Sequence, residues 1–284
     1  MPLRPPVYVH LLPALIPAGA LRGGVAVVID VLRATTTMLH ALAAGCDAII
    51  PCAEIDEARR VAGSLPPGSA LLAGEREGVA IEGFDLGNSP GDCTPEVCSG
   101  RTMVMTTTNG TRAILASLEA ERILIAAFVN REATIEALMV DGRPIHLVCA
   151  GTGGSISLED SMFAGALAHE IDTRAWRESE GKILPSARES DPAADTLLAN
   201  DEAEIAASLW RETEAIIDEG YSLADALGDG KGGRRVLELG LDADLDDAAR
   251  VDRFPFAAEL LRDPLRIVPA TEGSGPRLRL FGTT

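Results

Sequence analysis

Short apolar runs alternate with amphipathic segments along most of the chain, which is typical of α/β proteins. The pattern predicts strands over residues 25–29, 48–52, 70–73, 102–105, 122–129 and 145–149. It predicts helices over residues 37–44, 112–120, 132–140 and 158–176, and a longer one that Asn200 caps and that runs to about residue 219. We therefore expect an α/β fold with layers in the order α/β/α around a largely parallel sheet.

The remaining segments lack a clear helical or strand period. Residues 7–20 read as an incoming strand and loop, and residues 182–196 are polar, contain two prolines and read as a loop. Residues 228–233 are rich in glycine and predict a flexible connection, and residues 241–252 read as a solvated acidic face. Two short apolar runs follow, at 265–268 and 278–281. We expect a single domain over residues 1–284, divided into two closely packed lobes near 141–144.

Composition narrows the classes of partner. The 284 residues carry 43 acidic and 25 basic side chains, a formal net charge of −18 that repels phosphate backbones and anionic membrane surfaces. We therefore expect neither nucleic acid nor membrane as a partner, and no segment approaches the roughly 20 apolar residues of a membrane span. Five cysteines without a Cys-x-x-Cys pair favour a cytoplasmic location with reduced thiols. The oligomeric state stays open, a homo-oligomer included.

Three predicted strands are each followed by a loop of small or hydroxyl residues and then by a helix. In parallel sheets such loops lie at the carboxyl ends of strands, where ligands bind, and the helix N-termini there suit phosphate. The candidate binding residues are Thr35 and Thr36 in the first loop, Thr107, Thr108, Asn109, Gly110, Thr111 and Arg112 in the second, and Thr152 in the third. The alternative is that these residues only cap helices and form turns, as Ser157 and Asp160 could in a capping box.

Charged residues beside apolar runs add candidate chemistry. Asp30 directly ends a strand of buried type, where a carboxylate can hold a divalent metal ion. Glu75 and Arg76 follow another short apolar run, and a turn-rich loop at 83–90 contains Asn88 and Ser89. Standard dinucleotide, P-loop, cysteine-phosphatase and zinc spacings are absent from the sequence, and residues 242–247 lack the glycine of a calcium loop.

Taken together, the strings at 27–37, 73–76, 83–90, 107–112 and 149–152, with Glu159 and Asp160, resemble the 2-phosphosulfolactate phosphatase family. The resemblance covers about residues 7–268, and residues 187–204 and 253–265 depart from it. It implies an α/β fold particular to the family and a cytoplasmic, magnesium-dependent hydrolase. The implied reaction removes phosphate from 2-phospho-3-sulfolactate, a step towards coenzyme M.

The hypothesis for the site gives each candidate a role. Asp30, Glu159 and Asp160 are expected to bind Mg²⁺, with Asp30, Arg33, Glu75 and Arg76 as the catalytic set. Arg33 and residues 107–111 are expected to cradle the phosphoryl group of a small anionic substrate, and Arg76 and Arg112 its carboxylate or sulfonate. Thr35, Thr36, Asn88, Ser89 and Thr152 complete the expected binding residues.

Several readings remain open. Water could attack phosphorus directly, which we favour, or Asp30 could become phosphorylated. A phosphatase for another small phosphorylated hydroxy acid and a non-catalytic binder of phosphorylated metabolites are alternative functions. In a third reading the loops only pack and form no pocket. Whether the loops meet in space decides between the packing-only reading and the other two.

Overall fold

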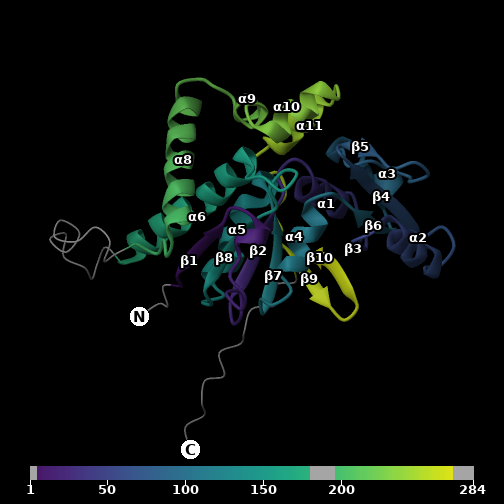
Figure 1. The fold of residues 1–284 in the computed structure, drawn as a ribbon, viewed down its shortest axis with the longest axis horizontal. Helices are drawn as coiled ribbons and strands as arrows, with labels where there is room; N and C mark the ends of the chain where they lie inside the picture. Colours follow the sequence, from purple (N-terminus) through teal and green to yellow (C-terminus); the bar gives the residue numbers. More distant parts are fainter. Residues whose placement is uncertain (1–4, 180–195, 271–284) are drawn as a thin grey trace, which may run out of the picture.

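A large sheet runs through the part of the chain that the computed structural model describes, residues 5–179 and 196–270 (Figure 1). Its strand order is β1-β8-β2-β7-β9-β10-β3-β6-β4-β5. The strands are β1 Val7–His10, β2 Val25–Ile29, β3 Ala48–Pro51, β4 Ala70–Arg76, β5 Val79–Ala80, β6 Thr102–Thr106, β7 Arg122–Ala126, β8 Ile145–Cys149, β9 Ala258–Arg262 and β10 Leu265–Pro269.

Helices flank this sheet. They are α1 Ala34–Ala43, α2 Ile55–Ser64, α3 Pro95–Cys98, α4 Gly110–Ala116, α5 Arg131–Met139, α6 Leu158–Ser179, α8 Asp201–Asp218, α9 Leu223–Gly228, α10 Lys231–Glu238 and α11 Asp242–Ala248. Short 3₁₀ turns form η1 Pro13–Leu15, η2 Pro90–Asp92 and η3 Phe128–Asn130. The expected layered α/β fold with a mostly parallel sheet is confirmed. Helices α9, α10 and α11 form a group of their own at the top of Figure 1.

Two parallel groups of strands make up most of the sheet. Strands β1, β8, β2 and β7 pair in parallel, as do β3, β6 and β4. The β9–β10 hairpin lies between β7 and β3 and pairs antiparallel with both. Sequence analysis placed a short apolar run at β10 but missed β9. The hairpin has no extended stretch of alternating apolar and polar residues that would have predicted both strands.

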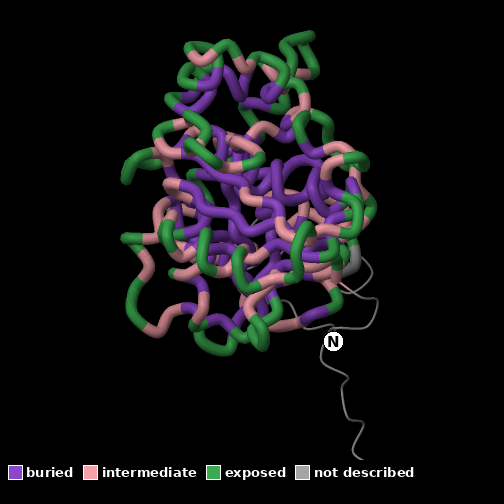
Figure 2. Tube along the Cα trace, turned by 90° about the vertical axis from the view of Figure 1, so that its right-hand side faces the viewer, coloured by how far each residue is buried: buried purple, intermediate pink, exposed green. Residues whose placement is uncertain are grey.

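Strand β2 shows how the apolar runs build the core. All five residues of Val25–Ile29 are fully buried, because helices cover both faces of a parallel strand. Val25, Val27 and Ile29 pack against α5, α6 and α8, whereas Ala26 and Val28 pack against the α1 and α4 side. Figure 2 shows buried residues concentrated in the interior and exposed ones at the periphery.

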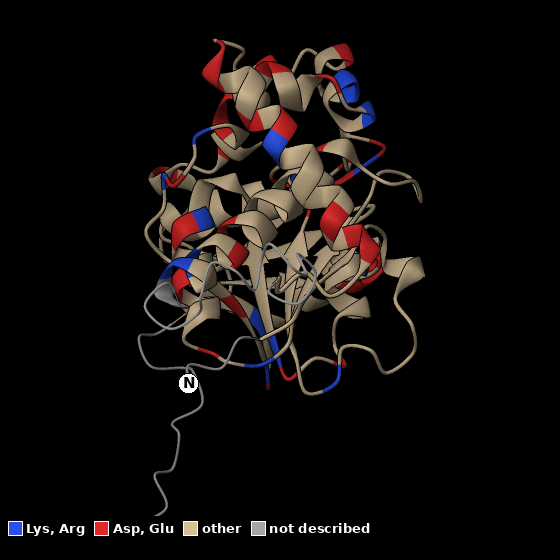
Figure 3. Ribbon diagram, turned by 90° about the vertical axis from the view of Figure 1, so that its left-hand side faces the viewer, with Lys and Arg blue, Asp and Glu red and all other residues tan. Residues whose placement is uncertain are grey.

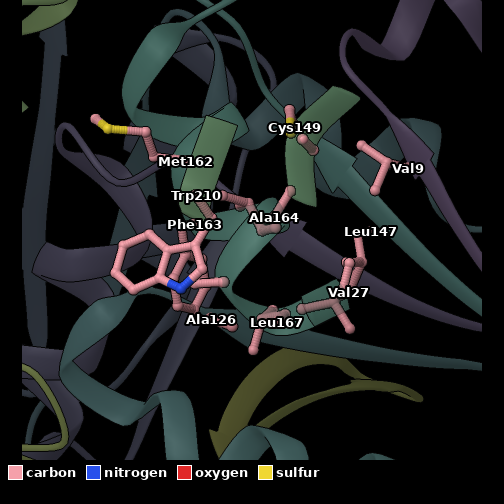
Figure 4. Close-up of a cluster of buried hydrophobic side chains, with 14 of the residues drawn as sticks. Val9, Val27, Ala126, Leu147, Cys149, Met162, Phe163, Ala164, Leu167 and Trp210 are labelled. Carbon is pink, nitrogen blue, oxygen red and sulfur yellow. The ribbon is translucent and has the colours of Figure 1, made fainter. Parts of the chain in front are cut away.

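Helix α8 closes the first of these faces. Trp210 of α8 and Phe163 of α6 both pack on Phe128, with ring centroids 5.6 and 4.8 Å from it (Figure 4 shows Trp210 and Phe163). The helices approach closely because Gly165 has no side chain; a Cβ there would overlap the Ala206 carbonyl. Asn200 caps α8 as predicted, since its side chain accepts a hydrogen bond from the Ala203 N–H.

Two predictions for the C-terminal part are wrong. Residues 228–233 are not a flexible connection: they end α9 and begin α10, and their glycines serve close packing described below. Residues 241–252 are not simply a solvated acidic face, because α11 buries Asp244. Residues 182–195 of the predicted loop and the apolar run at 278–281 lie outside the described residues.

The structure also bears on the predicted end of β7, the domain boundary, the cysteines and membrane spans. Strand β7 ends at Ala126 rather than at 129, because the Asn130 side chain accepts from the Ala127 N–H and holds the next residues in a 3₁₀ turn. The suggested boundary at 141–144 falls in the turn between α5 and β8, and the division into two lobes stays a prediction.

All five cysteines are free and buried. Within the described ranges, every helix is too short or too polar to cross a bilayer. Acidic residues, red in Figure 3, occur along many segments of the ribbon, consistent with the net charge.

Candidate active site

A cavity of about 480 Å³ lies where the loops after β2, β6 and β8 meet the turn between β4 and β5 and helix α10. The loops after β2 and β6 touch even though the β9–β10 hairpin separates these strands in the sheet: a Cβ on Gly110 would lie 2.6 Å from the Ala34 Cβ. The second and third loops also join, because Asn109 Oδ1 accepts from the Gly153 N–H at 3.2 Å. The reading in which the loops scatter and no pocket forms is therefore excluded.

Seven of the sequence-predicted residues line this cavity. They are Asp30, Arg33, Glu75, Asn88, Thr108, Asn109 and Thr152. The others, which do not line it, are Thr35, Thr36, Arg76, Ser89, Thr107, Gly110, Thr111, Arg112, Glu159 and Asp160. Most of these ten residues make hydrogen bonds to the loops that form the cavity wall, as described below.

Asp30 sits at the cavity wall directly after β2. One carboxylate oxygen accepts from the Ala34 N–H at 3.2 Å, and Gly110 leaves room for the other, since a Cβ there would come within 2.7 Å of Asp30 Oδ2. Burial raises the pKa of Asp30 to about 7, and the nearby carboxylates of Glu75 and Glu159 contribute in the same direction. The site therefore holds a carboxylate whose negative charge a bound cation would stabilise.

Arg33 is buried at the same wall, and three of the five N–H groups of its guanidinium donate hydrogen bonds within the protein. Its Nη1 donates to Asp244 Oδ2 at 2.7 Å and to Ser89 Oγ at 3.2 Å, and its Nη2 donates to the Gly78 carbonyl at 2.8 Å. Only about 5% of the Arg33 side chain and 6% of the Asp244 side chain are exposed. Asp244 of α11 thus fixes an arginine that follows a strand 211 residues earlier in the chain.

Glu75 fixes the loop after β6. Its Oε1 accepts from the Thr108 N–H at 2.7 Å, and its Oε2 accepts from the Gly78 N–H at 2.7 Å and from the Thr108 hydroxyl at 3.2 Å. These contacts make Glu75 a positioning residue. The guanidinium of Arg76 donates to Thr106 Oγ1 at 3.0 Å and to the carbonyl of Glu75, so Arg76 braces β4 against β6 instead of facing the cavity.

The buried threonines act largely on the backbone. The Thr35 hydroxyl donates to the Asp30 carbonyl at 2.8 Å, and the Thr36 hydroxyl donates to the Val31 carbonyl at 2.7 Å. Thr107 and Thr111 bond each other's backbone N–H and hydroxyl groups at the start of α4. These hydrogen bonds stay within the loops and first helical turns, whereas the N-cap residues of α1 and α4, Arg33 and Asn109, make no side-chain cap hydrogen bond. Arg112 is exposed at the surface of α4.

Asp160 also braces the backbone. Its Oδ1 accepts from the Val31 N–H at 2.9 Å and its Oδ2 from the Gly151 N–H at 3.0 Å, which ties the loops after β2 and β8 together. Burial raises the pKa of Asp160, and the charges of Asp30 and Glu159 raise it further. With both oxygens already accepting backbone hydrogen bonds, Asp160 has less capacity left for a metal ion than the other two carboxylates.

Glu159 is the carboxylate with an oxygen still free to accept a hydrogen bond or bind a cation. Its side chain is buried, and its Oε2 is among the few buried oxygens without a hydrogen-bond partner in the described part of the chain. Burial raises its pKa, while hydrogen bonds from Ser157 and Thr152 act in the opposite direction. The carboxylate lies against the first turn of α10, where a Cβ on Gly232 would overlap Oε1 and one on Gly230 would lie 2.5 Å from Oε2.

The donor set can be tested against the expected Mg²⁺. Within residues 5–179 and 196–270, no group of three or more His, Cys, Asp or Glu side chains has the arrangement of a metal site. Mg²⁺, however, commonly takes one or two carboxylates and completes its shell with water and phosphate oxygens. Asp30, with its raised pKa, and Glu159, with its unpartnered buried oxygen, fit that smaller set.

Sequence analysis missed the basic residues of α10. Lys231, Arg234 and Arg235 line the cavity together with Gly232. A signal was present: Lys231 is one of only two lysines in the chain and stands in the one Lys-Gly-Gly-Arg-Arg string. Its glycines suggested flexibility, whereas they permit α10 to pack on Glu159.

The chain is similar to known proteins over most of its length. The family model described as 2-phosphosulpholactate phosphatase matches residues 10–262. A protein of Synechococcus sp. (strain CC9605), named probable 2-phosphosulfolactate phosphatase, is 40% identical over 250 residues, 87% of this chain and 92% of that protein. A protein of the same name from Prochlorococcus marinus (strain MIT 9313) is 38% identical over the same shares of the two chains. A third, from Parasynechococcus marenigrum (strain WH8102), is 37% identical over 269 residues, 94% of this chain and 96% of that protein.

Proposed function

Because the chain belongs to the 2-phosphosulfolactate phosphatase family, a family of phosphoric monoester hydrolases, we propose that its cavity hydrolyses 2-phospho-3-sulfolactate to 3-sulfolactate and phosphate. The observation that carries the proposal is the meeting of Asp30, Arg33 and Thr108 at one cavity from loops far apart in sequence. In the reaction a water oxygen bonds to phosphorus, the bond from phosphorus to the ester oxygen breaks, and that oxygen leaves with a proton as the 2-hydroxyl of sulfolactate.

The residues divide the work by what they touch. Arg33 presents a fixed cation to the cavity, and Thr108 and Asn109 line it beside the N-terminus of α4; we assign them to the phosphoryl oxygens. Glu75 and Asp244 are positioning residues, because each holds one of these groups through hydrogen bonds. Fixing donors before the substrate arrives reduces the reorganisation that the transition state would otherwise require.

Magnesium belongs to the same proposal. Asp30 and Glu159 would hold the ion, and Asp160 would keep the loops around them in place. When bound, Mg²⁺ would neutralise charge on the phosphoryl oxygens. We assign Asp30 to the ion and favour direct attack by water, with a phosphorylated Asp30 as the alternative. The proposal includes a cytoplasmic location and a step towards coenzyme M.

Asp30→Asn tests the assignment. We expect the rate of phosphate release to fall at least ~10²-fold, the scale for losing a group that stabilises transition-state charge. The melting temperature should stay unchanged or rise, since burial already disfavours the charged carboxylate at this position. Full activity of the variant would remove Asp30 from the mechanism.

A substrate and metal series tests the reaction itself. Phosphate release is measured from 2-phospho-3-sulfolactate and from a panel of phosphorylated hydroxy acids, with Mg²⁺ and with EDTA. The proposal expects the highest kcat/KM for phosphosulfolactate and loss of turnover in EDTA that Mg²⁺ restores. A higher kcat/KM for another phospho-acid would favour the alternative substrate, and binding without any phosphate release would favour the non-catalytic binder.

A further inference from the structure

We propose that Lys231 and Arg234 of α10 form a second anion subsite, which binds the sulfonate or carboxylate arm of the substrate and selects phosphate esters that carry a further acidic group. This inference rests on the proposed phosphatase function and adds residues that determine its specificity. It replaces the expectation that Arg76 and Arg112 bind these groups, because neither lines the cavity.

The charge of the substrate requires such a subsite. Phosphosulfolactate carries roughly four negative charges when its phosphate is doubly ionised. Arg33 lines the cavity just after strand β2, and its charge is already offset by Asp244 at 2.7 Å. Glu77 and Glu238 also line the cavity and would repel an anion. A second acidic group therefore needs its own cations.

The basic residues of helix α10 differ in how many hydrogen bonds and ion pairs they already make. Arg235 is engaged, because its Nε and Nη2 donate to the Glu77 carbonyl at 3.3 and 3.2 Å and its Nη1 lies 3.3 Å from Glu238. Arg234 donates through Nη1 to the Asp229 carbonyl and interacts electrostatically with Glu159, while its other nitrogens make no hydrogen bond in the described part of the chain. In the described part of the chain the Lys231 ammonium has neither a hydrogen-bond nor an ion-pair partner. Lys231 is thus the cation best able to meet an incoming anion.

The packing of α10 holds these side chains at the cavity wall. Gly232 faces the Glu159 carboxylate, and a Cβ on Gly233 would overlap the Leu227 carbonyl, so side chains at either position would push the helix away. The bond from Arg235 to Glu77 ties the other side of α10 to the turn after β4. Because Glu159 lies over the first turn, the subsite depends on the Lys231 and Arg234 side chains and not on the helix N-terminus.

Kinetics with two substrates test the subsite. Lys231→Ala and Arg234→Ala are compared with Arg211→Ala, an exposed arginine of α8 outside the cavity. For phosphosulfolactate each cavity variant should raise KM by ~10–100-fold, the range for losing a hydrogen bond to a charged group. For phenyl phosphate, which has no second acid, kcat/KM should change less than about threefold. Equal losses on both substrates, or no loss on phosphosulfolactate, would overturn the proposal.

Chemical labelling gives a readout independent of turnover. The chain has two lysines, so amine-selective acylation followed by peptide mass spectrometry reports on Lys231 with Lys182 as internal reference. We expect 3-sulfolactate to protect Lys231 at least several-fold, Lys182 to label equally with and without it, and inorganic phosphate alone to protect Lys231 less. Labelling of Lys231 that 3-sulfolactate leaves unchanged would refute the subsite.

The two tests separate this inference from the reaction it rests on. If the wild-type protein released no phosphate from any ester but 3-sulfolactate protected Lys231, the phosphatase proposal would fail and the anion subsite would stand. If phosphosulfolactate were hydrolysed while neither variant nor ligand affected Lys231, the reaction would stand and the subsite would fall.

Discussion

Replacing Asp244 by Asn probes whether α11 controls Arg33. The exchange keeps the size of the side chain and removes the charge that lies 2.7 Å from the guanidinium. Arg33 would then be a buried cation with only neutral acceptors, Ser89 Oγ and the Gly78 carbonyl among them. Breaking a buried ion pair on one side typically costs about 3–5 kcal/mol.

We expect the lower end of that range, about 3 kcal/mol, for two reasons. The asparagine side chain introduced by the exchange can still accept one hydrogen bond from Arg33. Burial also raises the pKa of Asp244, so part of the attraction in the pair only offsets the desolvation of its carboxylate. In a chain of this size such a loss lowers the melting temperature by about 6–12 °C.

The assay is urea unfolding at pH 7, with phosphate release measured on the same preparations. Asp246→Asn is the matched control, because Asp246 is an exposed aspartate two residues away on the same helix, and it should change stability by less than about 0.5 kcal/mol. In the double variant Asp244→Asn with Arg33→Met, the two losses should fall short of additive, since the orphaned cation is gone. Equal stability of the two Asp→Asn variants would refute the conclusion that Asp244 of α11 holds Arg33 in place.

Two further predictions concern packing and pH. Gly232→Ala should cost about 1–3 kcal/mol in urea unfolding and lower activity by displacing Glu159, whereas Gly63→Ala, at an open helical position of α2, should leave stability unchanged or raise it by up to about 1 kcal/mol. Similar effects of the two substitutions would contradict the close contact. Burial, and then the neighbouring His10, lowers the pKa of His146 to about 4, below the value near 6.5 expected in the unfolded chain. The neutral folded form is therefore favoured, so this contribution to stability is complete above pH 6.5 and is lost as the pH falls towards 4. Unfolding free energies between pH 4.5 and 7.5 should show a shallower acid loss in His146→Phe, and parallel curves would exclude the effect.

The sequence predicts best what neighbouring residues decide. Strand β2 was found at its correct bounds because five consecutive aliphatic residues need cover on both faces. Asp30, Thr108 and Thr152, which line the cavity, were predicted because they lie within three residues of the ends of such strands. The alternative that Thr35 and Thr107 only form turns and cap helices was weighed from the same local pattern.

Partners distant in sequence could not be found in this way. Asp244 reads as one acid among several in a polar segment, and only the fold brings it to Arg33. The glycines beside Lys231 read as flexible, because the bulk that excludes a side chain there belongs to Glu159, some 70 residues earlier. Strand β9 was missed because its pairing partners, β7 and β10, and not its own short pattern, make it a strand.

The position of the β9–β10 hairpin has a consequence for biosynthesis. During translation the chain emerges from its N-terminus, so β7 and β3 are both made long before the hairpin that joins them. Until residues 258–269 have left the ribosome, each of these two strands has a free edge that can pair with another nascent chain. A chain truncated shortly before Ala258 would keep both edges open, and we expect it to pair with other chains and aggregate.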